Sequence, residues 1–285
     1  MKKIYASLGV LLLTVGVIAG CNNGSKNTGE STSESTSSET TVNSSTTEKG
    51  SSSSTSKTES STSTTESTSA SSAAAATPES QAEKVLNELA GLFPSEPLPN
   101  SILTSTTKTY LSSATTSAGD QSNFNILYYA EDQPIDVNST ELNELKPIAS
   151  MEKITFATEE EAKNEVGKIE DYAGTEVDLG YGLTGYMQGA AGSSYLTWAE
   201  GNWNLIIKAS NIDGEDPVSL GKEVVTYLEE NTLPIPQQDG NIQLEVGENG
   251  DYQTNSVAWQ KNNVVYKVHH FNAMEAVKMA VSTNG

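Results

Sequence analysis

Arginine is absent from this 285-residue sequence. All 16 basic residues are lysines, and 37 aspartates and glutamates outnumber them, so the formal net charge is −21. A chain without arginine has no planar guanidinium for bidentate capture of phosphate, and an acidic chain repels polyanions. We therefore expect no nucleic-acid partner.

Cysteine and histidine are almost absent. Cys21 is the single cysteine, so the chain can form no internal disulfide and must be stabilised by a core. The two histidines, His269 and His270, are adjacent, and neighbouring side chains on a strand point to opposite faces. They cannot hold one metal ion together, and we expect His270 to be a strand-end histidine on the face of Trp259 and Val268. No metal and no cofactor are predicted.

A long apolar run is also missing. The run at residues 4–18 follows Lys2 and Lys3 and is shorter than the roughly 20 residues that a membrane-spanning helix needs. Ala19 and Gly20 follow it, which is typical of a secretory signal with a small-residue cleavage site. The pattern predicts a signal peptide over 1–20, whose removal takes away the two lysines and changes the net charge from −21 to −23.

The residues Ile18-Ala19-Gly20-Cys21 resemble the lipobox of bacterial lipoproteins. The resemblance implies cleavage before Cys21 and a diacylglycerol on its sulfur, with acyl chains such as palmitate. Two acyl chains, each burying methylenes at about 0.8 kcal/mol apiece, suffice for stable anchoring. The implied location is the extracytoplasmic face of the cell membrane. The alternative is an ordinary signal peptide with a chance cysteine.

Residues 21–77 comprise Cys21 and a linker dominated by serine and threonine. Ordering such a segment would cost backbone entropy with almost no apolar burial in return, so the composition predicts a disordered linker. A flexible coil of this length spans about 40 Å. A long polar stalk after a lipobox resembles lipoproteins of Gram-positive bacteria, and it could be glycosylated or cross a cell wall.

Residues 78–285 carry the patterns of a globular domain. Helix starts are predicted where a capping residue precedes helical apolar spacing: at Thr77-Pro78, Thr158, Asp216-Pro217 and Asn272. The last of these helices is apolar almost all round, so we expect it to be buried. Alternating segments predict strands at 124–130, 150–157, 175–183, 193–200, 203–210, 241–246, 255–261 and 264–270.

Two predicted hairpins can be superposed. A turn at Gly201-Asn202 would pair Trp198 with Leu205, and a turn at Asn262-Asn263 would pair Trp259 with Tyr266. A predicted helix follows each hairpin, which suggests an internal repeat of 193–231 and 254–283. Chance similarity between two hairpins is the alternative.

Repeated hairpin-plus-helix units predict an α+β fold, with an antiparallel sheet and helices packed on one face.

The stretch GYGLTG at 180–185 has the G-x-G-x-x-G spacing of a dinucleotide-binding loop. That loop requires a helix that begins at the last glycine. Instead, Val177, Leu179, Tyr181 and Leu183 alternate through the glycines, so we place them inside one strand, at a bulge or a close packing contact. We therefore expect no nucleotide.

Two further polar motifs give only weak evidence, one for catalysis and one for calcium binding. Ser219-x-x-Lys222 matches the serine–lysine pair of penicillin-binding enzymes, which suggests an envelope hydrolase or acyl-transfer enzyme as an alternative function. The same string recurs at 54–57, 105–108 and 150–153, and the chain contains no K-T-G partner, so we favour a solvent-facing helix start. The oxygen-rich loop 211–216 lacks the spacing of an EF-hand calcium loop.

Aromatic residues between 180 and 203 offer a candidate ligand site, with Tyr181, Tyr186 and Trp203 as its residues. By the predicted pairing, however, the tryptophans face the same side as Leu196 and Leu205, so we favour a core role for them. The resulting expectation is a lipid-anchored, extracytoplasmic lipoprotein with a non-catalytic binding domain. Its partners would be the membrane, through Cys21, and a cell-wall component or envelope protein.

Overall fold

A computed structural model describes residues 75–104, 107–116, 120–168, 172–247 and 250–284. The predicted signal peptide, Cys21 and nearly all of the Ser/Thr-rich linker lie outside these residues. The described residues all belong to one of the two compact units of the chain.

The helices begin where the capping residues predict. In the described part of the chain, the α-helices are α1 (Pro78–Leu92), α2 (Glu159–Val166), α3 (Pro217–Glu230) and α4 (Ala273–Val281), with short 3-10 helices at η1 (Thr140–Glu144) and η2 (Ser282–Asn284). Their N-caps are Thr77, Thr158, Asp216 and Asn272, and each side chain accepts a hydrogen bond from the first turn. Buried residues line most of α4, which confirms the expected burial.

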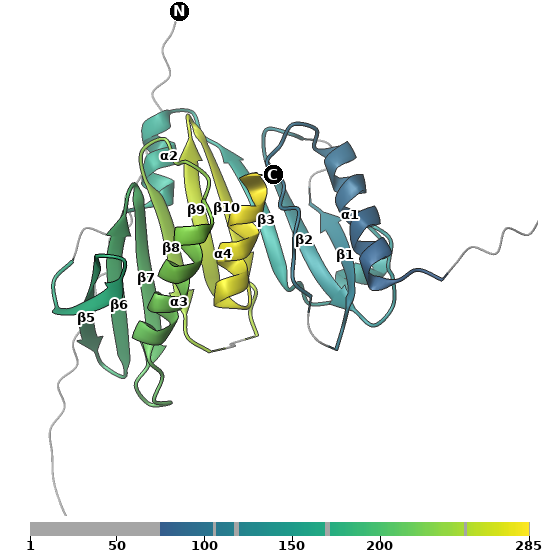
Figure 1. Cartoon of the computed structure of the whole chain (residues 1–285). Helices are drawn as coiled ribbons and strands as arrows, with labels where there is room; N and C mark the ends of the chain where they lie inside the picture. The colour runs from purple at the N-terminus through teal and green to yellow at the C-terminus, as the bar shows by residue number, and fades with distance from the viewer. Residues whose placement is uncertain (1–74, 105–106, 117–119, 169–171, 248–249, 285) are drawn as a thin grey trace, which may run out of the picture. The chain divides into compact units, whose positions relative to one another are not determined.

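Ten strands form one sheet in the described residues (Figure 1). They are β1 (Tyr110–Thr115), β2 (Phe124–Glu131), β3 (Ala149–Thr155), β4 (Thr175–Gly180), β5 (Leu183–Ala190), β6 (Ser193–Glu200), β7 (Trp203–Ser210), β8 (Gly240–Glu245), β9 (Asn255–Lys261) and β10 (Val264–His270). Their order across the sheet is β1-β2-β3-β10-β9-β8-β7-β6-β5-β4. The fold is therefore α+β, as predicted, and the sequence patterns had missed β1.

The sheet is mixed and not purely antiparallel, which corrects the prediction. β7 and β8 pair in parallel, with Trp203 opposite Gly240 and Leu205 opposite Ile242. Parallel neighbours require a crossover connection, and the segment that contains α3 supplies it. The other adjacent pairs are antiparallel.

Both predicted hairpins have the predicted register. Trp198 pairs with Leu205 in the β6–β7 hairpin, and Trp259 pairs with Tyr266 in the β9–β10 hairpin. Two-residue turns fix the register of a hairpin, which is why local sequence sufficed to predict it.

The glycine stretch 180–185 does not run through one strand, and this prediction was wrong. β4 ends at Gly180, β5 begins at Leu183, and Tyr181 lies in the turn with a positive φ of 53°. Gly180 and Gly182 also have positive φ values, so the backbone reverses there and does not continue. A strand follows the glycines where a dinucleotide-binding loop would require a helix.

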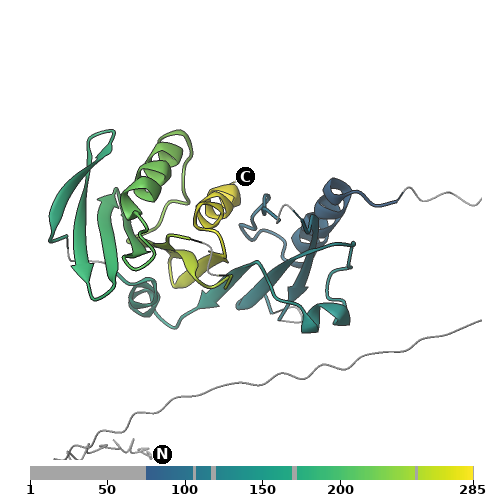
Figure 2. The same cartoon turned by 90° about the horizontal axis from the view of Figure 1, so that it is seen from below.

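The helices cover both faces of the sheet, which corrects the expected packing on one face. α1, α3 and α4 contribute to the main core, whereas Ala162 and Val166 of α2 pack against Val265 in a separate cluster. Val265 alternates with Tyr266, which belongs to the main core, so the two clusters lie on opposite faces. Figure 2 shows α2 on the other side of the strands from α3 and α4.

The main core contains all three tryptophans. Trp198, Trp203 and Trp259 are exposed by 0%, 7% and 3%, so the interpretation of the tryptophans as core residues is confirmed. Trp203 lies at the beginning of β7 and also lines a pocket at that end of the sheet.

Candidate functional site

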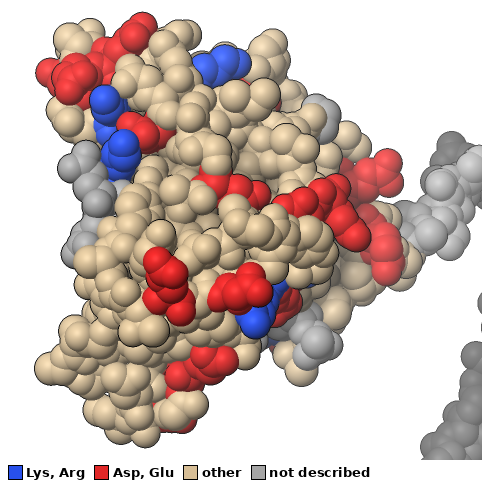
Figure 3. Space-filling view, turned by 60° about the vertical axis from the view of Figure 1, so that its left-hand side comes forward, with Lys and Arg blue, Asp and Glu red and all other residues tan. Residues whose placement is uncertain are grey.

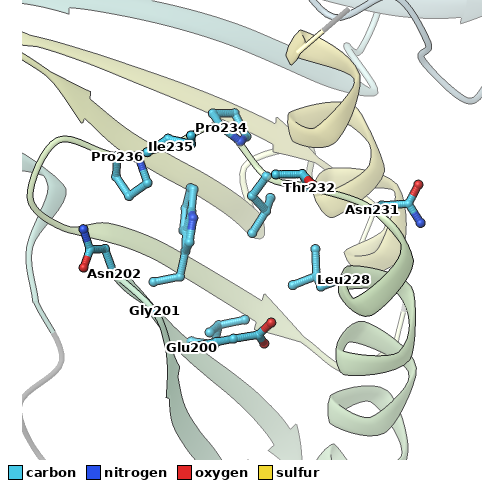
Figure 4. Close-up of a pocket in the computed structure, with 12 residues that line it drawn as sticks. Glu200, Gly201, Asn202, Leu228, Asn231, Thr232, Pro234, Ile235 and Pro236 are labelled. Carbon is cyan, nitrogen blue, oxygen red and sulfur yellow. The ribbon is translucent and has the colours of Figure 1, made fainter. Parts of the chain in front are cut away.

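A pocket of about 390 Å³ opens beside the β6–β7 turn (Figure 4). Three segments form it: the turn, the end of α3 and the segment 232–236, which we call the strap. We call the cavity the strap pocket. Its lining residues are Glu200, Gly201, Asn202, Trp203, Leu205, Leu228, Asn231, Thr232, Leu233, Pro234, Ile235 and Pro236.

The strap is an extended segment because it contains two prolines. Proline cannot continue a helix, and α3 ends at Glu230, shortly before Pro234 and Pro236. The Asn284 side chain donates to the Thr232 carbonyl oxygen at 2.6 Å, and Gln237 N–H donates to the Gln260 carbonyl oxygen at 2.9 Å. The strap is therefore fastened at both ends.

Ile235 is the exposed centre of the strap. Its side chain is 87% exposed, while Pro234 and Pro236 on either side are buried. A second hollow, of about 490 Å³, lies against the same three residues and is lined further by Trp259, Tyr266, Lys261 and others. Ile235 thus belongs to the lining of two hollows.

Trp203 forms a wall of the strap pocket because its register partner is a glycine. A Cβ atom at Gly240 would come within 2.5 Å of the indole ring. The missing side chain allows the ring to lie against the β8 backbone, and the Gly240 N–H donates to the Asn202 carbonyl oxygen at 2.9 Å. Local packing thus holds the indole in place.

Glu200 places a carboxyl group in this apolar cavity. It is the single charged residue among the described residues that line the pocket, and it is half-buried. Burial raises the pKa of Glu200, and the nearby Glu229 carboxylate raises it further. The Trp198 indole N–H opposes both effects, since it is close enough to favour the charged form.

Trp198 Nε1 and Glu200 Oε2 are buried polar atoms of two side chains that lie close together. The indole N–H is near enough to favour the charged carboxylate, but neither atom meets full hydrogen-bond geometry with a described residue. In Figure 4, Glu200, Leu228 and Pro234 border a common space, and Asn231 is turned away from it. The Asn231 amide instead donates to the Tyr227 carbonyl oxygen at 2.9 Å.

The three aromatic residues predicted as a site do not form one. Trp203 lines the strap pocket, and Tyr181 lies 64% exposed in the β4–β5 turn, at the same end of the sheet. Tyr186 pairs with Thr197, which alternates with the core residue Trp198, so Tyr186 lies on the opposite face of the sheet from Trp203. The ring centroid of Tyr186 lies 6.1 Å from that of Tyr172.

Ser219 and Lys222 lie in the first turns of α3, and both are exposed. The Ser219 hydroxyl donates to Asp216 Oδ2 at 2.6 Å, and this contact belongs to the helix cap. Ser219 thus contacts the capping carboxylate, which favours the helix-start interpretation of the motif.

Both histidines lie where the alternation predicts, on opposite faces at the end of β10. His270 is fully buried, with Nε2 3.2 Å from the Leu103 carbonyl oxygen and Nδ1 accepting from Asn272 N–H at 3.0 Å. Burial lowers the pKa of both His269 and His270. Within the described ranges, no group of three histidine, cysteine, aspartate or glutamate residues is placed to hold a metal ion.

The oxygen-rich loop 211–216 is hydrogen-bonded to Ser210 at the end of β7. Glu215 Oε2 accepts from Ser210 N–H at 2.7 Å, and Asp213 Oδ2 accepts from the Ser210 hydroxyl at 2.6 Å. These bonds close the turn between β7 and α3.

The surface around these elements is acidic. Figure 3, turned so that the left-hand side of Figure 1 comes forward, shows carboxylates gathered on the visible face with few lysines among them.

None of the described helices is both long and apolar enough to cross a bilayer.

Comparison with protein-family models, curated protein sequences and solved structures finds no match to this chain.

Sequence reasoning missed Glu200 and the strap. The sequence patterns assign no binding role to Glu200 or to Leu233-Pro234-Ile235-Pro236. Two prolines directly after a predicted helix are a signal for an extended surface segment. What that segment covers depends on the fold.

Proposed function

We propose that this protein is a lipid-anchored, extracytoplasmic binding module whose ligand occupies the strap pocket. The observation that carries the proposal is the Glu200 carboxyl, half-buried in an otherwise apolar cavity, with its Oε2 atom buried and outside hydrogen-bond geometry to any described residue. Buried polar groups in proteins are almost always hydrogen-bonded, so such a carboxyl favours a site that a ligand completes.

The pocket has the composition of a small-molecule site. Apolar walls from Trp203, Leu228 and Leu233 surround one carboxyl group, and the cavity of about 390 Å³ lies in the size range of ligand pockets. A cell-wall component is the ligand class that fits the proposed location, and the exposed Ile235 offers an envelope protein a contact beside it.

A thermal-shift screen of the full-length chain tests the pocket. Wall fragments, sugars, peptides and small amines are added, and unfolding is followed for the described domain. A ligand that binds the native state at 100 times its Kd raises stability by about 2.7 kcal/mol. We expect the unfolding temperature to rise with ligand concentration until it saturates, and the spectroscopic signal of the Trp203 indole to change on binding. A cooperative transition that no compound moves would contradict the proposal.

The anchoring is proposed on the lipobox-like residues and Cys21 alone. Cys21→Ala should release the protein from membranes, because the acyl chains are attached to that sulfur. Membrane partitioning of the variant in Gram-positive cells measures this, with Ser25→Ala in the linker as the control. Continued partitioning of Cys21→Ala into the detergent phase would contradict lipidation.

We also infer that 193–231 and 254–283 derive from one duplicated hairpin-plus-helix unit. The equal register of the two hairpins supports this inference, as do the N-caps Asp216 and Asn272 that follow them. The copies diverge after their helices, because α3 leads on to β8 whereas η2 follows α4.

A further inference from the structure

The strap pocket has an acidic group in its lining and no basic group among its described lining residues. Its one charged lining group is the Glu200 carboxyl, and no lysine lies among the described lining residues. Pro234 and Pro236 have no backbone N–H, and the Asn231 amide already donates to Tyr227. The pocket therefore has one charged acceptor in a largely apolar wall and no cationic group among its described lining residues to balance it.

The aromatic wall of the strap pocket favours a cationic ligand, as the Glu200 carboxyl does. Trp203 is held against Gly240 and lines the cavity with its remaining surface. A cation over an indole face gains about 0.5–2 kcal/mol, depending on desolvation, and tryptophan is the best of the aromatic partners. Glu200 is the register partner of Trp203 in the β6–β7 hairpin, so the carboxyl group and the indole belong to neighbouring positions.

We propose that the strap pocket binds a primary ammonium group carried on an apolar stem, such as an alkylamine or a lysine side chain. The ammonium group pairs with Glu200, and the stem packs on Trp203, Leu228 and Leu233. This inference rests on the proposed function of the pocket and adds the class of ligand to it.

The charge of the surroundings supports the assignment. The Glu229 carboxylate is close enough to raise the pKa of Glu200, so the two negative charges repel each other, and a bound cation relieves that repulsion. Lys261 lines the adjoining hollow but not the strap pocket. We therefore place the ammonium group of the ligand on the Glu200 side of the strap, away from Lys261.

The test compares n-butylamine with 1-butanol, two probes with the same stem that differ in charge. The full-length chain in lipid nanodiscs is labelled with 5-fluorotryptophan, whose three resonances report Trp198, Trp203 and Trp259 separately. We expect saturable shifts of the Trp198 and Trp203 signals, with a Kd for butylamine at least fivefold below that for butanol. Probes this small bind weakly, in the millimolar range.

Matched variants identify the group responsible. Glu200→Gln keeps the shape of the side chain and should weaken butylamine binding at least fivefold, while butanol binding changes less than twofold. Glu83→Gln removes the same charge from an exposed site on α1, and it should change neither affinity by more than twofold. The variant pair separates the local carboxylate from the overall negative charge of the chain.

The outcomes are distinct. Equal affinity for the two probes, or unchanged butylamine binding in Glu200→Gln, overturns the ammonium inference and leaves the pocket as a binding site. Saturation by neither probe, together with a thermal-shift screen without a response, overturns the proposed function as well. The comparison of two probes on the unmodified protein holds even if Glu200→Gln folds poorly.

Discussion

Trp203 and Gly240 are register partners in the parallel β7–β8 pair, and the indole ring of Trp203 occupies the space where a Gly240 side chain would lie. The contact joins residues 37 positions apart and fixes one wall of the strap pocket. The parallel pairing, which the sequence patterns did not predict, creates it.

Gly240→Ala should therefore destabilise the protein. The new Cβ would lie 2.5 Å from the ring, and overpacking of this kind costs about 1–3 kcal/mol of the free energy of unfolding. Urea denaturation measures the loss. Gly91→Ala is the control, because a Cβ there meets no atom within 4 Å and alanine is favoured over glycine in the α1 helix. Equal stability of Gly240→Ala and wild type would show that the ring is free to move.

Ile235→Ser should weaken ligand binding and leave stability nearly unchanged. The side chain lines the strap pocket but is 87% exposed, so its removal from the native state costs less than about 0.5 kcal/mol. Ile212→Ser is the matched control, since Ile212 is 86% exposed in the turn after β7, at the opposite end of that strand. Binding of butylamine to both variants is compared with thermal unfolding. Equal affinities in the two variants would remove Ile235 from the site.

Glu200 should make stability fall as the pH rises above about 4.5. Burial and Glu229 raise the pKa of Glu200 above its ordinary value of 4.5, so the native state holds its proton over a range in which the unfolded chain has lost it. The native state then binds more protons, and stability decreases with rising pH through that window. Glu200→Gln should be more stable than wild type at pH 7 and similar to it at pH 3. Denaturant unfolding at both pH values measures this, and an equal difference at the two would contradict it.

The two histidines should make stability fall as the pH decreases, which is the opposite of the effect of Glu200. Burial lowers the pKa of His269 and His270 below 6.5, so the unfolded chain takes up protons first as the pH falls. Stability is then lost progressively below about pH 6.5. Protonated His270 also cannot accept from Asn272 N–H at the start of α4. NMR titration of the two imidazoles checks the native pKa values, and a value above 6.5 for His270 would contradict the assignment.

Local sequence predicted the features that depend on neighbours in the chain. Thr158 and Asn272 begin helices because their side chains satisfy the backbone of the next turn, a contact within three residues. The Trp198–Leu205 and Trp259–Tyr266 pairs follow from two-residue turns. Tyr181 was misplaced because alternation continues through a turn whose positive φ values the hydrophobic pattern does not reveal.

The sequence by itself determined the helix starts, the hairpin register and the class of fold, because capping and turn contacts act over a few residues. It also carries the lipobox-like residues and Cys21, on which the proposed anchoring rests. Only the tertiary structure decided that β8 joins β7 in parallel and that α2 packs on the other face of the sheet. It also decided that Glu200, Trp203 and the strap enclose one pocket. These relations join segments that lie far apart in the sequence, and their free energy depends on long-range packing that no local pattern encodes.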